Sequence, residues 1–197
     1  ASSQNGASIL WTENGTGSLS GATTLTPTYT PGNGETGNVT LTMTVQGQGN
    51  CSSAVSTMTL NIQSGATADA GADDDICEGN TYQVTDATAA NYTSLLWTEN
   101  GTGTLTSANT LSPTYTPGTN ETGIVTLTLT ATGPGSCGNA VSTKELEIFG
   151  EPTADAGPDG STCAGISYTV SGASSQNGAS ILWTENGTGS LSGATTL

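Results

Sequence analysis

The stretch IVTLTLTATG at residues 124–133 decides the fold class of this chain. Its side chains alternate strictly, so that Val125, Leu127 and Leu129 lie on one face and threonines lie on the other. A period of two with one apolar face is typical of a half-buried β-strand. Threonine, valine and isoleucine are common throughout the chain, and these β-branched residues favour strands.

The sequence on both sides of this stretch predicts more short strands, about seven in the unit 65–150, and no helical periodicity. Pro113 and Pro117 confine their segment to edge strands and turns. The other segments are ATADAG (66–71), an acidic turn ADDD (72–75), TYQVTD (81–86), SLLWTENG (94–101), TLTSANTLSPTYTPG (104–118) and AVSTKELEIF (140–149). Short alternating strands at hairpin spacing predict an all-β fold, a β-sandwich. The expected core is Tyr82, Val84, Leu96 or Trp97, Tyr115, Val125, Leu127, Leu129, Val141 and Ile148.

Self-similarity divides the chain into tandem repeats of 86 residues. Trp11, Trp97 and Trp183 are 86 residues apart, and residues 1–25 recur unchanged at 173–197, a shift of two repeats. Two repeat types therefore alternate along the chain. The predicted organisation is the C-terminal part of one Ig-like repeat (1–64), one complete repeat (65–150) and the N-terminal part of the next (151–197).

Composition excludes several functions. The chain has 16 acidic residues, no histidine and a single basic residue, Lys144, for a net charge of -15. One lysine does not neutralise phosphates, so nucleic acid is excluded as a partner, and an anionic membrane surface would repel the chain. No apolar run reaches the roughly 18 residues of a membrane span. The recurring Glu13, Glu99 and Glu185 have no partner acid, so no catalytic or cofactor-binding residue is predicted and we expect no enzyme.

The four cysteines, Cys51, Cys77, Cys137 and Cys163, predict disulfides in an oxidising, extracellular setting. They lack the close spacing and histidines of a zinc site and any basic partner that would activate a nucleophile. Two pairings are open. A Cys77–Cys137 bridge would close one repeat internally, whereas immunoglobulin topology places these two positions at opposite ends and would pair Cys77 with the following repeat.

Six acidic residues near the predicted repeat junctions are candidate metal ligands: Asp69, Asp73, Asp74, Asp75, Asp155 and Asp159. Ca²⁺ takes several carboxylate and carbonyl oxygens, and an ion there would stiffen the junction. The alternative is a set of solvated turns, because the third repeat keeps only two of the aspartates and no DxDxDG loop occurs. No other cofactor is predicted.

Several motifs together resemble a known family. They are ADAGxDxxxC(E/A)G, LWTxNGTG, PTYTPG (113–118), GxVTLTLTATG and a glycine-rich turn with a cysteine, and they cover the whole chain. They resemble the PKD-like or Ig-like repeats of giant Bacteroidetes surface proteins, the SprB-type gliding-motility adhesins. The resemblance implies export by the type IX secretion system and long cell-surface filaments that motors in the envelope move.

These observations predict a stalk of an extracellular adhesin, used in surface adhesion and gliding motility. Its expected partners are neighbouring repeats of the same chain, surface polysaccharide and the cell-envelope motility machinery. The alternative is a surface or matrix protein that binds a glycan in each repeat. Such a site needs clustered exposed aromatic side chains, and the nine aromatic residues of this chain mostly read as core.

Overall fold

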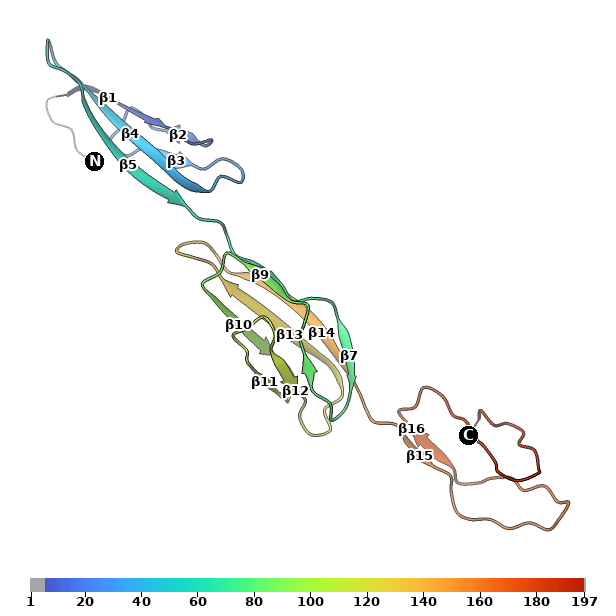
Figure 1. Cartoon of the computed structure of the whole chain (residues 1–197). Coiled ribbons are helices and arrows are strands. Elements are labelled where there is room, and N and C mark those ends of the chain that lie inside the picture. Colours follow the sequence, from blue (N-terminus) through green and yellow to red (C-terminus); the bar gives the residue numbers. More distant parts are fainter. Residues whose placement is uncertain (1–5, 197) are drawn as a thin grey trace. The chain divides into compact units, whose positions relative to one another are not determined.

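The computed structural model describes residues 6–196, all as strands, turns and loops (Figure 1). The chain groups into two compact units, one formed by residues 1–66 with the turn 133–138 and one by residues 67–132 with 139–197. No helix that could cross a membrane occurs among the described residues. The all-β fold predicted from the alternating segments is confirmed.

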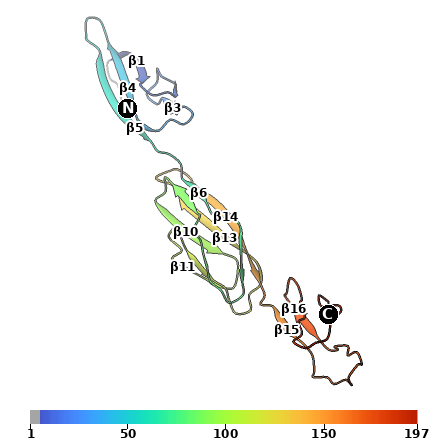
Figure 2. The same cartoon turned by 45° about the vertical axis from the view of Figure 1, so that its right-hand side comes forward.

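The complete repeat contains nine strands. They are β6 (Thr67–Asp69), β7 (Asp74–Cys77), β8 (Tyr82–Gln83), β9 (Thr88–Ala90), β10 (Ser94–Glu99), β11 (Thr104–Thr106), β12 (Thr114–Thr116), β13 (Gly123–Thr132) and β14 (Ala140–Phe149). One sheet has the order β10-β13-β14-β7 and the other has the order β11-β12-β8, while β6 pairs with β9. Figure 2 shows β6 lying beside β14.

The core of the complete repeat lies between the two sheets. Leu127 and Leu129 of β13 are fully buried, and the threonines that alternate with them lie on the opposite, partly exposed face. Tyr82 of β8 and Tyr115 of β12 supply the core from the second sheet. Two sheets that bury their facing side chains against each other make a β-sandwich, as the sequence predicts.

One predicted core residue is wrong, because Val141 is 60% exposed. Of the two alternatives Leu96 and Trp97, the structure buries Trp97, whereas Leu96 is 54% exposed. Val141 and Ile148 are seven positions apart, an odd number, so a straight strand cannot turn both inward. In β14 the inward residues are Lys144, Leu146 and Ile148, and in β10 they are Leu95 and Trp97.

Three further local predictions need correction. Asp74 and Asp75 lie in β7, which pairs in parallel with β14, and not in a turn. The segment between Pro113 and Pro117 forms β12, the central strand of its sheet. The prolines lie just outside that strand, so they do not interrupt its hydrogen bonds. The prediction of about seven strands missed β7 and β9, which are short and have no alternating apolar pattern.

The first repeat keeps five of these strands: β1 (Gly6–Glu13), β2 (Ser18–Ser20), β3 (Thr28–Thr30), β4 (Gly37–Gly47) and β5 (Ala54–Ile62). Its larger sheet has the order β1-β4-β5. Trp11 pairs with Met43 there, and Trp97 pairs with Leu129 in the complete repeat, which is the same register shifted by 86. Trp11, Val39 and Leu41 form its core.

The third repeat has two strands among its described residues, β15 (Thr153–Asp155) and β16 (Ser174–Gln176). They pair with Thr153 opposite Gln176, which repeats the pairing of Thr67 with Ala90 in β6 and β9. The rest of the described segment, up to residue 196, forms loops.

Candidate functional site

The most unusual polar group of the complete repeat is the buried side chain of Lys144. The alternation of β14 turns this residue inward, and it is 1% exposed. Its Nζ donates a hydrogen bond to Tyr82 Oη at 2.6 Å and forms an ion pair with Asp86 Oδ1 at 3.2 Å. The ammonium also lies 5.0 Å from the centre of the Tyr82 ring, within reach of a cation–π attraction. The only sequence signal for this inward lysine is its position in the alternation of β14.

The pKa values show that this cluster stays charged around neutral pH. Burial alone would lower the pKa of Lys144, but the hydrogen bonds to Tyr82 and Asp86 outweigh it and raise the pKa above its ordinary value. The backbone N–H of Ala72, 2.8 Å from Asp86 Oδ2, and then Lys144 lower the pKa of Asp86. Neither group is poised to exchange a proton near pH 7, so the cluster has a structural character and not that of an acid–base site.

The two repeat types differ at both members of this ion pair. At a shift of 86, Met58 takes the place of Lys144 and Gly172 takes the place of Asp86. The cation and its carboxylate are therefore absent together from the other repeat type. Lys144 and Asp86 therefore do not form a ligand site that every repeat shares.

A second cluster ties a loop to the sandwich in both repeats that contain it. Tyr115 Oη donates to Glu121 Oε2 at 2.8 Å, and the backbone N–H groups of Thr102 and Gly118 donate to the same carboxylate at 2.5 and 2.7 Å. Tyr29 and Glu35 repeat this arrangement in the first repeat. The recurring spacing of tyrosine and glutamate, six residues apart, is the sequence signal that could have revealed the cluster.

Burial and hydrogen bonding set the protonation of this tyrosine–glutamate cluster. Burial by itself would raise the pKa of Glu121, but the donors of Thr102, Gly118 and Tyr115 lower it overall. Burial and then the Glu121 carboxylate raise the pKa of Tyr115 well above its usual range. The tyrosine stays a donor and the glutamate an acceptor at neutral pH. Gly103 of the NGTG sequence leaves room for the ring, because a Cβ there would overlap Tyr115.

Four of the six predicted Ca²⁺ ligands accept hydrogen bonds from backbone N–H groups. Asp69 and Asp155 each accept from the glycine two residues later, at 3.0 and 2.8 Å, and Asp73 accepts from Glu145 at 2.7 Å. Asp74 accepts from the next residue, and Asp159 is exposed. Across residues 6–196, no three carboxylate, thiol or imidazole groups gather closely enough to hold a metal ion.

The cysteines of one repeat lie at opposite ends of the sandwich. Cys77 is the last residue of β7 and pairs with Phe149, the last residue of β14. Cys137 lies in the turn before Ala140, the first residue of β14. Nine residue steps of about 3.3 Å separate the two ends of β14 by about 30 Å. A disulfide needs Cα atoms within about 7 Å, so the structure does not bring Cys77 and Cys137 together.

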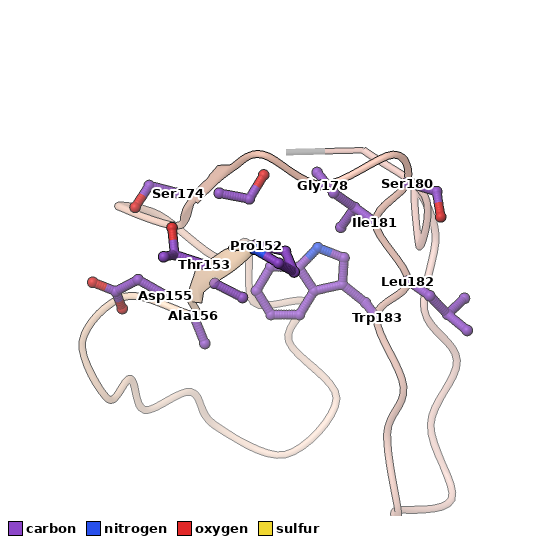
Figure 3. Close-up of a pocket in the computed structure, with 12 residues that line it drawn as sticks. Pro152, Thr153, Asp155, Ala156, Ser174, Gly178, Ser180, Ile181, Leu182 and Trp183 are labelled. Atoms are coloured by element: carbon purple, nitrogen blue, oxygen red, sulfur yellow. The ribbon is translucent and has the colours of Figure 1, made fainter. Parts of the chain in front are cut away.

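A cavity of about 480 Å³ lies in the third repeat beside the indole of Trp183 (Figure 3). Pro152, Thr153, Ile181 and Leu182 are among its lining residues. The identical sequence in the first repeat places Trp11 against Val39 and Leu41, where it is 8% exposed. The cavity therefore corresponds to the space that core residues fill beside Trp11 in the first repeat. It is not evidence for a glycan site in each repeat.

No family model matches the chain, and no curated protein matches it. Solved structures that it resembles include immunoglobulin domains 1–4 of Sidekick-1, with 16% identity over 77% of this chain and 45% of that one and a TM-score of 0.33. Titin domains I67–I69, in an E-to-A variant, give 11% identity over 74% of this chain and 56% of that one, with a TM-score of 0.39.

An endo-fucoidan hydrolase of glycoside hydrolase family 107 is also similar, with 15% identity over 73% of this chain and a TM-score of 0.30. The chain spans about a quarter of that protein and less than half of the Sidekick-1 structure. At these scores the similarities carry no functional argument. The fold assignment rests on the strand pairing and the burial described above.

Proposed function

We propose that this chain is a segment of a passive stalk, built from tandem Ig-like sandwiches, in a large extracellular adhesin. The observation that carries the proposal is repetition at two levels. An unchanged 25-residue segment recurs after 172 residues, and strand registers recur after 86. Each sandwich buries a core of its own, so copying repeats adds length without a new fold.

The junctions and the charge suit this mechanical role. Only Gly150, Glu151 and Pro152 separate β14 from β15, and a proline ring fixes its own φ. A linker this short, with a proline, restricts neighbouring repeats far more than a long glycine–serine coil would. The net charge of -15 opposes folding back and lateral clumping at low salt.

The finer assignment rests on the sequence motifs. Their resemblance to SprB-type repeats supports a cell-surface filament, exported by the type IX secretion system and used in adhesion and gliding motility. The proposed partners are neighbouring repeats, surface polysaccharide and the motility machinery of the envelope. The proposal needs no catalytic residue and no cofactor.

Small-angle X-ray scattering of chains with two, four and eight repeats tests the stalk. The maximum dimension should grow linearly by about 30–45 Å per repeat, because a strand of 8–10 residues rises about 3.3 Å per residue and the turns at both ends add to its length. A matched control carries a long glycine–serine linker in place of residues 150–152, and its dimension should grow more slowly. Compact particles that grow as the cube root of repeat number would overturn the proposal.

A further inference from the structure

Strand β14 runs between the two ends of the complete repeat, and one cysteine lies near each of its ends. The chain enters at the leading end, where the Ala70 N–H donates to Ser142 Oγ at 3.0 Å near the start of β14. Cys137 lies in the turn at this same end. The chain leaves at Phe149, the trailing end, where Cys77 is the residue paired with it. Every complete repeat thus carries one thiol where the chain arrives and one where it departs.

The connection between repeats keeps a trailing end close to the next leading end. Phe149 ends β14 and Thr153 begins β15, the counterpart of β6, so four Cα steps join them. Fully extended, four steps span at most about 14 Å. This limit holds for any angle between consecutive repeats. A Cys77-type thiol is therefore confined near the leading end of the repeat that follows it, and about 30 Å from the other thiol of its own repeat.

The compact unit formed by residues 1–66 and 133–138 gives a second, independent observation. Within it, Cys137 Sγ lies 3.8 Å from the backbone oxygen of Gln63. Gln63 is the counterpart of Phe149 at a shift of 86, and Phe149 is the residue that pairs with Cys77. Cys137 thus touches the strand end beside which a Cys77-type thiol lies in the complete repeat.

We propose that a disulfide joins each Cys77-type cysteine to the Cys137-type cysteine of the following repeat. With two alternating repeat types, Cys77 pairs with the next copy of Cys51, and Cys137 pairs with a preceding copy of Cys163. The two thiols lose two protons and two electrons and form one S–S bond. A disulfide donor accepts them by thiol–disulfide exchange and leaves as a dithiol. Cys51, Cys77 and Cys163 are exposed, which leaves them accessible to such a donor.

The bridges would change how tension passes through the stalk. Without them, pulling can extend all 86 residues of each repeat, the spacing from Cys77 to Cys163. With them, the shortest covalent path crosses a bridge, runs through the 60 residues between Cys137 and Cys77, and crosses the next bridge. The extensible length per repeat falls from 86 to 60 residues, a loss of about 30% at a fixed length per residue. The inference needs only consecutive repeats and does not depend on the proposed adhesin.

Peptide mapping of a lengthened chain tests the pairing. Residues 26–64 are added again after Leu197, which completes the third repeat, and Cys51→Ser removes the competing thiol of the first copy. After refolding with oxidised glutathione, digestion without reduction should give a peptide that links Cys77 to the added copy of Cys51. A Cys77→Ser variant should lose that peptide and keep the circular dichroism spectrum of the parent.

Two results of the mapping would overturn the proposal. One is a Cys77–Cys137 link, and the other is a Cys77 that reacts fully with an alkylating reagent in the oxidised, folded chain. Single-molecule pulling of an eight-repeat array adds an independent readout. The contour length should correspond to 60 residues per repeat when oxidised and to 86 with dithiothreitol. Equal lengths in both conditions would contradict the bridges, while the scattering test of the stalk would be unaffected.

Discussion

The segments 6–24 and 178–196 have the same sequence and different structures. In the first, residues Gly6–Glu13 form β1, which pairs along its length with β4. In the second, the residues at the same positions form no strand within the described part of the chain. Trp11 is 8% exposed, whereas its counterpart Trp183 lines a cavity.

The features that the two segments share are local. The N–H of Trp11 donates to the oxygen of Ala22 at 2.7 Å, and that of Trp183 donates to Ala194 at 2.8 Å. Both indoles donate to a threonine oxygen thirteen residues later. Hydrogen bonds between residues about a dozen positions apart thus form in both segments and follow from their shared sequence. Strand formation and burial of the indole require β4, because the partners of an edge strand come from elsewhere in the chain.

Removal of the repeated tryptophan should affect stability most, and the size of the effect should differ between the two segments. Trp97→Ala deletes a side chain that is 2% exposed, and we expect it to lower the free energy of unfolding of the complete repeat by about 3–5 kcal/mol. Trp183→Ala should change the free energy by less than about 0.5 kcal/mol, because no strand covers its indole. Urea denaturation followed by circular dichroism measures both.

Adding a counterpart of β4 to the third repeat should remove the difference between the two segments. With residues 26–64 added after Leu197, the fluorescence of Trp183 should shift to shorter wavelength. Trp183→Ala should then lower the free energy of unfolding by as much as Trp97→Ala. Equal costs of the two substitutions in the original chain would contradict the role assigned to the partner strand.

Disruption of the buried ion pair should give an intermediate effect. It tests whether lysine with aspartate in one repeat type and methionine with glycine in the other are interchangeable pairs. Asp86→Gly leaves the Lys144 ammonium buried without a carboxylate, a change that costs about 3–5 kcal/mol for a fully buried pair. The Asp86 side chain is 44% exposed, so we expect about 2–3 kcal/mol. The measurement is the urea midpoint of the complete repeat.

The matched control combines Asp86→Gly with Lys144→Met, which copies the residues of the other repeat type. Because no charge is then left unpaired, the double variant should lie within about 1 kcal/mol of the parent. A double variant as unstable as Asp86→Gly alone would show that the two positions are not coupled.

The tyrosine–glutamate cluster should give the smallest effect, and the same effect in either repeat. Glu121→Gln replaces a charged acceptor of three hydrogen bonds, which should lower the free energy of unfolding by about 1–2 kcal/mol. Tyr115→Phe is the matched control, because it removes one donor and leaves the carboxylate to the two backbone N–H groups. Denaturation of Glu35→Gln should show whether the first repeat behaves alike.

The pH dependence follows from the direction of the pKa shift. The pKa of Glu121 is lowered from 4.5 in the folded repeat, so its stabilisation is present above the unfolded value and is lost as pH falls through the folded value. Thermal unfolding between neutral pH and pH 3 should show this loss in the parent and a weaker one in Glu121→Gln. An identical loss in both would contradict the assignment.

The alternation of β13 was sufficient to predict a strand within one residue of its observed bounds, together with its buried leucines. It was equally present in β14, yet Val141 was assigned to the wrong face and Lys144 was not assigned to the core. Hydrophobicity favours valine over lysine as a core residue, but the register that buries Leu146 and Ile148 also buries position 144. The sequence left two cysteine pairings open, and the parallel pairing of β7 with β14 showed that Cys77 and Cys137 lie at opposite ends of the repeat.

The repeat length, the all-β class, the positions of the long strands and the tight loops around each tryptophan follow from the sequence alone. These depend on side-chain alternation, turn residues and hydrogen bonds between residues close in the chain. Only the folded structure settled which face of β14 is buried, how Lys144 is paired and which cysteines can meet. Those outcomes depend on groups brought together from distant positions, such as the 58 residues between Asp86 and Lys144, and no local pattern encodes that proximity.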